Sequence, residues 1–128
     1  MSESWFEEWV ARAEEDYRAA NALDPADVPG VVCFLCQQCI EKYLKAALVK
    51  HDIPTRKTHD LIVLVGLLEP KDLRFRQVVG PARHLSAFAV EVRYPGPEVD
   101  ADLATEAVHI MRDLRADIRR LLDLEVES

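Results

Sequence analysis

The stretch that decides the fold is residues 31–51, which read VVCFLCQQCIEKYLKAALVKH. Apolar side chains recur in it at every third or fourth position, the spacing of one face of an α-helix: Leu35, Cys36, Cys39, Ile40, Tyr43, Leu44 and Ala47. A second stripe is polar and of mixed charge, which is typical of a solvated face or of a contact between subunits: Gln38, Glu41, Lys42 and Lys45. The sequence therefore predicts a helix over 31–51, about 30 Å long.

Helical spacing continues on both sides of this segment. It predicts further helices over 4–23, 59–69, 81–93 and 100–123. Residues 71–79 are compatible with an irregular turn or a short helix. Thr58 is expected to cap the third helix and Asp100 the last one, because their side-chain oxygens can accept hydrogen bonds from the first turn. Short loops favour antiparallel neighbours, so we expect an all-α fold: an antiparallel up-and-down four-helix bundle with one additional short helix.

The charge of the chain is unevenly distributed. Its 128 residues fit one domain over 1–128. The net charge of −7 argues against a protein that binds nucleic acid without regard to sequence. Residues 1–30 hold two Arg against eight acids, and residues 98–128 hold four Arg against nine acids. Residues 41–60, in contrast, hold five Lys or Arg against three acids. If the acidic ends pack side by side, the basic middle forms a separate face that could meet phosphate or an acidic partner.

Several features predict a cytoplasmic protein that contacts no membrane. The uncharged runs are far shorter than the roughly 18–20 residues that a membrane helix needs. The opening MSESWFEEWV is acidic and lacks the apolar segment of a signal peptide. Three cysteines without a disulfide pattern fit a reducing compartment.

Cys33, Cys36 and Cys39 have the spacing of a metal-binding run, C-x2-C-x2-C. Metal clusters need four ligands, and Tyr43 stands where a fourth cysteine is expected. On a helix these positions fan out instead of converging, so buried thiols are the better interpretation. The histidines form no H-x3-H or H-E-x-x-H pair, and no glycine-rich phosphate loop is present. We therefore expect neither a metal site nor a cofactor.

Three motifs together resemble those of small prokaryotic HEPN-domain proteins, the family of nucleotide-binding domains shared by higher eukaryotes and prokaryotes. Residues 34–48 (FLCQQCIEKYLKAAL) look like that family's F-x-x-Q-Q-A-x-E-K-x-L-K-A-L-L helix. Residues 58–61 (THDL) match the start of its third helix, and residues 92–95 (VRYP) match its A-R-Y-P segment. The first helix, from Trp9 to Ala20, also fits, so the resemblance spans nearly the whole chain.

This resemblance implies a fold, a partner and a ligand. HEPN domains are four-helix bundles with a short extra helix, and they commonly form homodimers. Small members are often paired with a minimal nucleotidyltransferase in a two-component system, some acting as toxin and antitoxin. The domain was proposed to bind nucleotides, and many members are metal-independent ribonucleases.

The family's ribonuclease motif, an Arg followed by a His after four to six positions, is not found in this sequence. The first histidine after Arg93 is His109, while Arg76 and His84 are separated by seven residues. RNA cleavage needs an acid or base near the 2′-hydroxyl as well as a cation on the phosphate. We therefore assign no catalytic residue and favour a non-catalytic nucleotide-binding or partner subunit. The alternatives are a divergent ribonuclease toxin, or a plain dimerisation module.

The residue most expected to bind a ligand is Arg93, because its planar group fits a phosphate or a carboxylate at two points. One interpretation places it around a single cleft with other polar and aromatic groups: Tyr94, His59 and Lys45. A second interpretation pairs Arg93 with Glu41 or Asp60, in an ion pair that only locks the bundle. Both remain open from the sequence.

Overall fold

Five α-helices and one 3-10 helix make up the regular structure of the described residues, 3–93 and 99–126, in a computed structural model of the chain. Side chains are described for 4–88 and 99–126. The elements, in chain order, are α1 (Glu3–Ala22), α2 (Pro29–Lys50), α3 (Leu61–Leu68), η1 (Leu73–Val78), α4 (Val79–Arg93) and α5 (Ala101–Leu121). The predicted all-α fold is confirmed.

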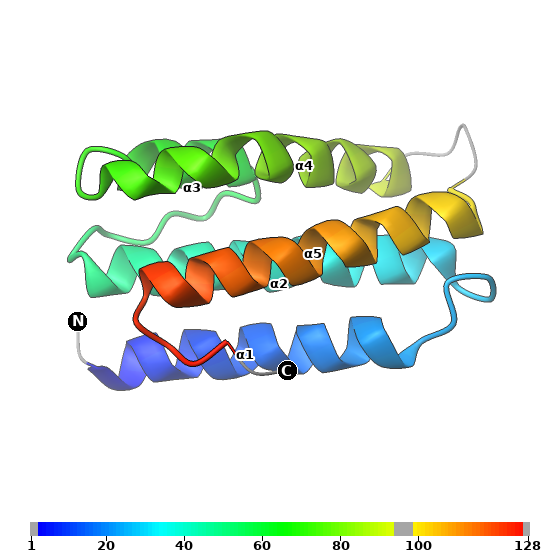
Figure 1. Cartoon of the computed structure of the whole chain (residues 1–128), viewed down its shortest axis with the longest axis horizontal. Helices are drawn as coiled ribbons and strands as arrows, with labels where there is room; N and C mark the ends of the chain where they lie inside the picture. Colours follow the sequence, from blue (N-terminus) through cyan, green and yellow to red (C-terminus); the bar gives the residue numbers. More distant parts are fainter. Residues whose placement is uncertain (1–2, 94–98, 127–128) are drawn as a thin grey trace.

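The four long helices α1, α2, α4 and α5 alternate in direction along the bundle, as Figure 1 shows. The short helix α3 lies beside α4 and precedes η1, so the predicted additional short helix is also present. Helix α2 packs against α1, α3, α4 and α5 and is therefore the centre of the molecule. None of the helices within the described ranges is long and apolar enough to cross a membrane.

The central position of α2 buries most of it. Fourteen of its 22 residues are buried, including apolar side chains that meet those of every neighbouring helix. Two members of its polar stripe, Glu41 and Lys45, are buried as well. The prediction of a solvated face is thus wrong for these two residues, because the stripe is covered by neighbouring segments of the same chain.

The helix ends differ slightly from the predicted ones. Helix α2 starts at Pro29, since proline is tolerated in the first turn where its missing N–H has no partner to lose. Residues 73–78 form η1, which runs directly into α4, so that α4 begins two residues before the predicted start. Thr58 does not cap α3: the Asp60 carboxylate does, accepting from the Ile62 backbone N–H at 2.9 Å. Asp100 caps α5 as predicted.

The three cysteines lie in the core, on the buried side of α2. Burial raises the pKa of the Cys36 thiol to about 12, and it also raises the pKa of Cys39 well above its usual value. No group of three or more His, Cys, Asp or Glu suited to a metal ion occurs among the residues that the structure describes. The thiols therefore act as small apolar side chains.

One carboxylate, Glu14 of α1, ties three helices together. It receives two hydrogen bonds from the Arg115 guanidinium of α5, Nε to Oε2 at 2.7 Å and Nη2 to Oε1 at 2.6 Å. The Tyr43 hydroxyl of α2 donates to the same carboxylate and accepts from Arg119 Nη1 at 2.8 Å. Burial alone would raise the pKa of Glu14, but hydrogen bonds from Arg115 and Tyr43 outweigh it and lower the pKa below its ordinary value.

We expect Glu14→Gln to lower the free energy of unfolding by about 2 kcal/mol at pH 7, because it removes charged hydrogen bonds from a partly buried site. The folded state lowers the pKa of Glu14, so the carboxylate stabilises the fold above its ordinary pKa of 4.5. This contribution disappears as the pH falls through the lower pKa of the folded state. Urea unfolding at pH 7 and at about pH 3 measures the difference between the variant and the parent chain, which should shrink in acid.

The matched control for this prediction is Glu8→Gln. Glu8 lies on the same helix and pairs with Arg12 at 2.8 Å, but both side chains are largely exposed. We expect it to change the free energy of unfolding by less than about 0.5 kcal/mol. An equal loss from Glu14→Gln at both pH values would contradict the assignment of a charged Glu14.

Candidate functional site

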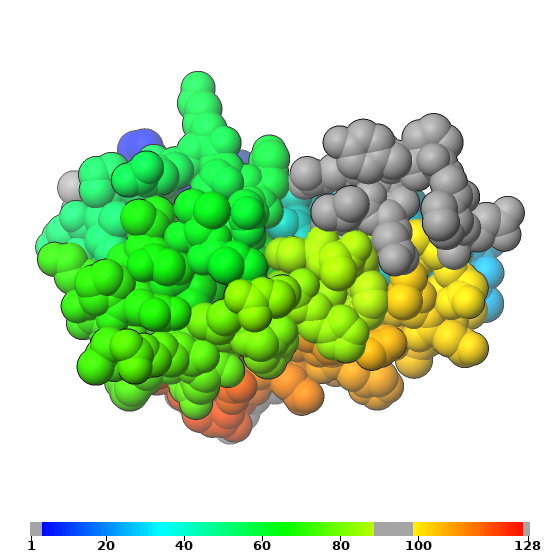
Figure 2. Space-filling model, turned by 90° about the horizontal axis from the view of Figure 1, so that it is seen from above, coloured from blue at the N-terminus to red at the C-terminus, as the bar shows by residue number. Residues whose placement is uncertain are grey.

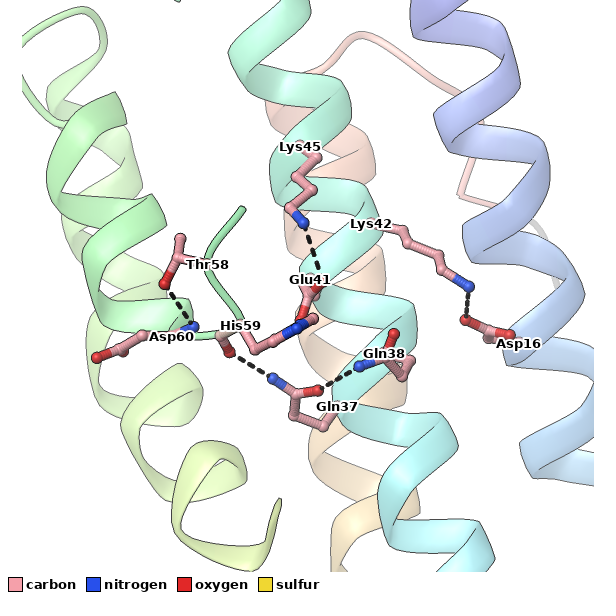
Figure 3. Close-up of polar contacts among 9 residues, drawn as sticks. All are labelled: Asp16, Gln37, Gln38, Glu41, Lys42, Lys45, Thr58, His59 and Asp60. Carbon is pink, nitrogen blue, oxygen red and sulfur yellow. Dashed lines mark hydrogen bonds and ion pairs between the residues drawn. The ribbon is translucent and has the colours of Figure 1, made fainter. Parts of the chain in front are cut away.

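The candidate site lies on the face of α2 between α1 and the segment that leads into α3 (Figure 3). Its centre is Glu41, whose side chain is only 4% exposed. Carboxylate oxygen Oε1 lies 3.0 Å from His59 Nδ1, and Oε2 accepts from Lys45 Nζ at 3.1 Å. Because a buried carboxylate is costly without partners, each of its two oxygens is held by a basic group.

The backbone of His59 is held as well as its ring. Gln37, one turn before Glu41 on α2, donates its Nε2 to the His59 carbonyl oxygen at 2.8 Å. Gln38 Nε2 in turn donates to Gln37 Oε1 at 3.1 Å. The His59 side chain nevertheless remains 59% exposed. The ring is therefore fixed through Nδ1, while its other edge, which carries Nε2, can meet a ligand.

Lys45 links this site to the first helix. Its Nζ pairs with Glu41 and also lies 5.5 Å from the centre of the Trp9 ring of α1. A cation at this distance from an indole is attracted by the electrons of the ring. One turn away, Lys42 Nζ lies 2.6 Å from Asp16 Oδ2 and joins α2 to α1 a second time.

The segment that joins α2 to α3 supplies the remaining charge. Arg56 and Lys57 are exposed in it, just before His59. Figure 2 shows this segment, in blue-green to green, at the surface beside α3. The basic middle of the sequence thus meets solvent here, and His59 in the same segment is exposed as well.

Glu41 contacts both Lys45 and His59, two of the residues that the first interpretation placed around one cleft with Arg93 and Tyr94. Asp60 is adjacent but its carboxylate caps α3. Arg93 is the last residue of α4, and its side chain lies outside the described residues, as does Tyr94 altogether. The predicted pairing of Arg93 with Glu41 or Asp60 therefore stays a prediction, while the partners of Glu41 that the structure describes are Lys45 and His59.

Two residues of the site, Gln37 and Trp9, are not indicated by the sequence pattern. Gln37 was not assigned to either stripe, although it precedes Glu41 by one helical turn and therefore shares its face. For Trp9, no local pattern in the sequence indicates its contact with Lys45. The sequence does place the Gln37 amide between Cys36 and Cys39, which both lie on the apolar side of the predicted helix. This position was the available signal that Gln37 is buried and needs a hydrogen-bond partner.

The geometry defines the class of protein: an up-and-down helical bundle whose central helix carries buried, paired charges beneath an exposed histidine. Comparison with protein families adds that the HEPN domain model matches residues 6–121 of the chain. The chain therefore belongs to the HEPN-domain family, and the resemblance drawn from its motifs is confirmed. Neither the curated proteins nor the solved structures give a match.

Chemically, this arrangement suits an anionic ligand. An imidazole whose Nδ1 is held by a carboxylate presents Nε2 in a fixed direction, where it can donate to or accept from a ligand oxygen. Exposed guanidinium and ammonium groups nearby favour phosphate or carboxylate over a cation. A carboxylate-held histidine can also transfer a proton in acid–base chemistry.

We expect Glu41→Gln to destabilise the fold by about 3 kcal/mol, because it leaves the buried ammonium of Lys45 without a charged partner. The double change Glu41→Met with Lys45→Met removes both charges and should recover most of this loss. Urea unfolding of the parent chain and the two variants measures these differences. A double variant no more stable than Glu41→Gln would contradict the assigned pair.

Proposed function

We propose that this HEPN-domain protein binds a nucleotide and serves as the non-catalytic partner subunit of a minimal nucleotidyltransferase, in a toxin–antitoxin-like two-component system. The observation that carries the nucleotide part is the exposed His59 ring held by buried Glu41. The fixed ring follows two exposed basic residues in the chain, Arg56 and Lys57, and this combination suits a phosphate group.

Charge complementarity supports the choice of ligand. The chain is acidic overall, yet the residues around His59 come from its basic middle segment. An anionic ligand is attracted to this segment and repelled by the acidic ends, which favours its approach to one face. The nucleotidyltransferase partner rests on the resemblance to small HEPN proteins, and it would bring nucleotides to this face.

The test of nucleotide binding is calorimetric titration with AMP and ATP. We expect His59→Ala to weaken binding at least about ten-fold, as for the loss of one charged hydrogen bond. The matched control is His109→Ala, since His109 is also exposed but lies on α5. Equal affinity of the parent chain and His59→Ala would contradict the assignment of His59.

A ribonuclease is the second candidate, favoured by the same Glu41–His59 pair. The carboxylate could hold the imidazole as an acid or base while Arg93 meets the phosphate, with both residues distant in sequence. We expect no useful cleavage of single-stranded RNA by the purified protein, because the family's Arg and His spacing is missing. Cleavage that is lost in His59→Ala or Arg93→Ala would overturn this expectation and favour the toxin.

The proposed assembly is a homodimer, as the family resemblance implies. Val31 and Phe34 lie one turn apart at the start of α2 and remain substantially exposed, so they form one part of the larger surface that a second copy would cover. Light scattering at micromolar concentration should give twice the chain mass of 14.5 kDa. A single species at the mass of one chain would contradict the dimer.

A further inference from the structure

Both tryptophans of the chain lie on α1, one helical turn apart, and both line the same hollow. The hollow has a volume of about 230 Å³ and is lined by Trp5, Glu8, Trp9 and Arg12. Trp5 is 55% exposed, and Trp9 is half-buried. The Arg12–Glu8 ion pair at 2.8 Å forms the charged part of the lining.

This hollow adjoins the candidate site through Lys45. The Trp9 ring faces Lys45 Nζ at 5.5 Å, Lys45 pairs with Glu41, and Glu41 holds His59. A continuous row of contacts therefore runs from the Trp9 indole of α1 across the face of α2 to the imidazole. Aromatic rings stand at one end of this row, and the basic groups near His59 stand at the other.

We propose that Trp5 and Trp9 form a nucleobase subsite, so that the ligand of this face is a 5′-nucleotide unit with its base against the indoles and its phosphate toward His59. This inference rests on the proposed nucleotide binding and adds the group that recognises the base. The unit can be a free nucleotide or part of single-stranded RNA, because both present the same base and phosphate.

Indoles suit a nucleobase because any base can stack on an aromatic face, whatever its hydrogen-bond donors and acceptors. A ligand that is only charged and strongly hydrated gains little from contact with an exposed indole. A planar base, in contrast, can stack on the indole and cover it. Lys45 contacts both Trp9 and Glu41, and so it fixes the Trp9 indole relative to the carboxylate that holds His59. Aromatic and basic groups on one face thus match the two chemically different halves of a nucleotide.

A second copy of the chain is the less fitting occupant of this hollow. Phe6 and Val10, the other large apolar residues of this part of α1, already pack against the core. Two indoles offer at most about 200 Å² each, while a stable interface buries about 800 Å² on each partner. The apolar surface available here therefore fits a small planar group better than a dimer contact.

The test uses the intrinsic fluorescence of the full-length protein, because the chain has two tryptophans and both lie in the hollow. The probes are AMP, adenosine, ribose 5-phosphate and a short oligoadenylate. We expect AMP and adenosine to quench the emission, and ribose 5-phosphate to leave it unchanged. We also expect AMP to bind about ten-fold more tightly than ribose 5-phosphate, which is the contribution of one stacked base.

Trp5→Leu should weaken AMP binding about ten-fold and leave the affinity for ribose 5-phosphate unchanged, both measured by calorimetry. Its matched control is Leu73→Ala, since Leu73 is a large apolar residue 62% exposed on η1, outside both proposed surfaces, and it should bind AMP as the parent chain does. Oligoadenylate binding more tightly than AMP, with the same quenching, would identify RNA as the source of the unit. Equal affinities would identify the free nucleotide.

Several results would overturn the inference and distinguish it from the proposed function. If AMP and ribose 5-phosphate bind equally and Trp5→Leu changes neither, the base subsite is wrong while phosphate binding stands. If adenosine quenches the emission but no phosphate improves its affinity, the assignment of His59 is wrong while the base subsite stands. If Trp5→Leu converts a dimer into a monomer in light scattering, Trp5 belongs to a contact between copies and the inference fails.

Discussion

The position of α2 between four other helices is the constraint on which the rest of the structure depends. A helix packed against four others must bury most of the side chains that its sequence places on it, and the sequence of α2 includes charged residues. Burying a charge is unfavourable unless a partner is at hand. The neighbouring segments of the chain must therefore place groups of opposite charge, or hydrogen-bonding groups, beside each buried charge of α2.

Each side of α2 meets this requirement differently. Toward α1 and α5, the Tyr43 hydroxyl joins Glu14 and the arginines of α5 in a network that connects three helices. Toward the segment before α3, Glu41 holds an exposed histidine. The first arrangement is enclosed and stabilises the bundle, whereas the second ends at the surface. The same central helix of this chain thus contributes both to stability and to the proposed binding face.

The features of the fold and the site that could be predicted from the sequence are those that depend on contacts between residues close in the chain. The repeat of apolar residues in 31–51 is a local property, and it predicted α2 to within two residues at its start. The burial of Glu41 and Lys45 could not be predicted, because it depends on where α1 and the 58–60 segment lie after folding. The prediction of the residue that caps α3 was wrong for a related reason. Thr58 and Asp60 both carry suitable oxygens, and the path of the linker places Asp60 at the first turn. The contact between Glu41 and His59 also joins residues far apart in the sequence, and helical spacing alone does not indicate it.

The buried thiols of α2 make the opening of the bundle measurable by chemical modification. Only the thiolate of a cysteine reacts readily with alkylating reagents, and burial raises the pKa of Cys36 to about 12. Cys33 and Cys39 are buried beside it on the same helix. In the closed bundle all three are protected, so each modification event requires the surrounding helices to separate from α2 first. The rate at which these thiols are alkylated therefore follows the opening of the centre of the bundle, and a ligand or partner that tightens the fold would slow it.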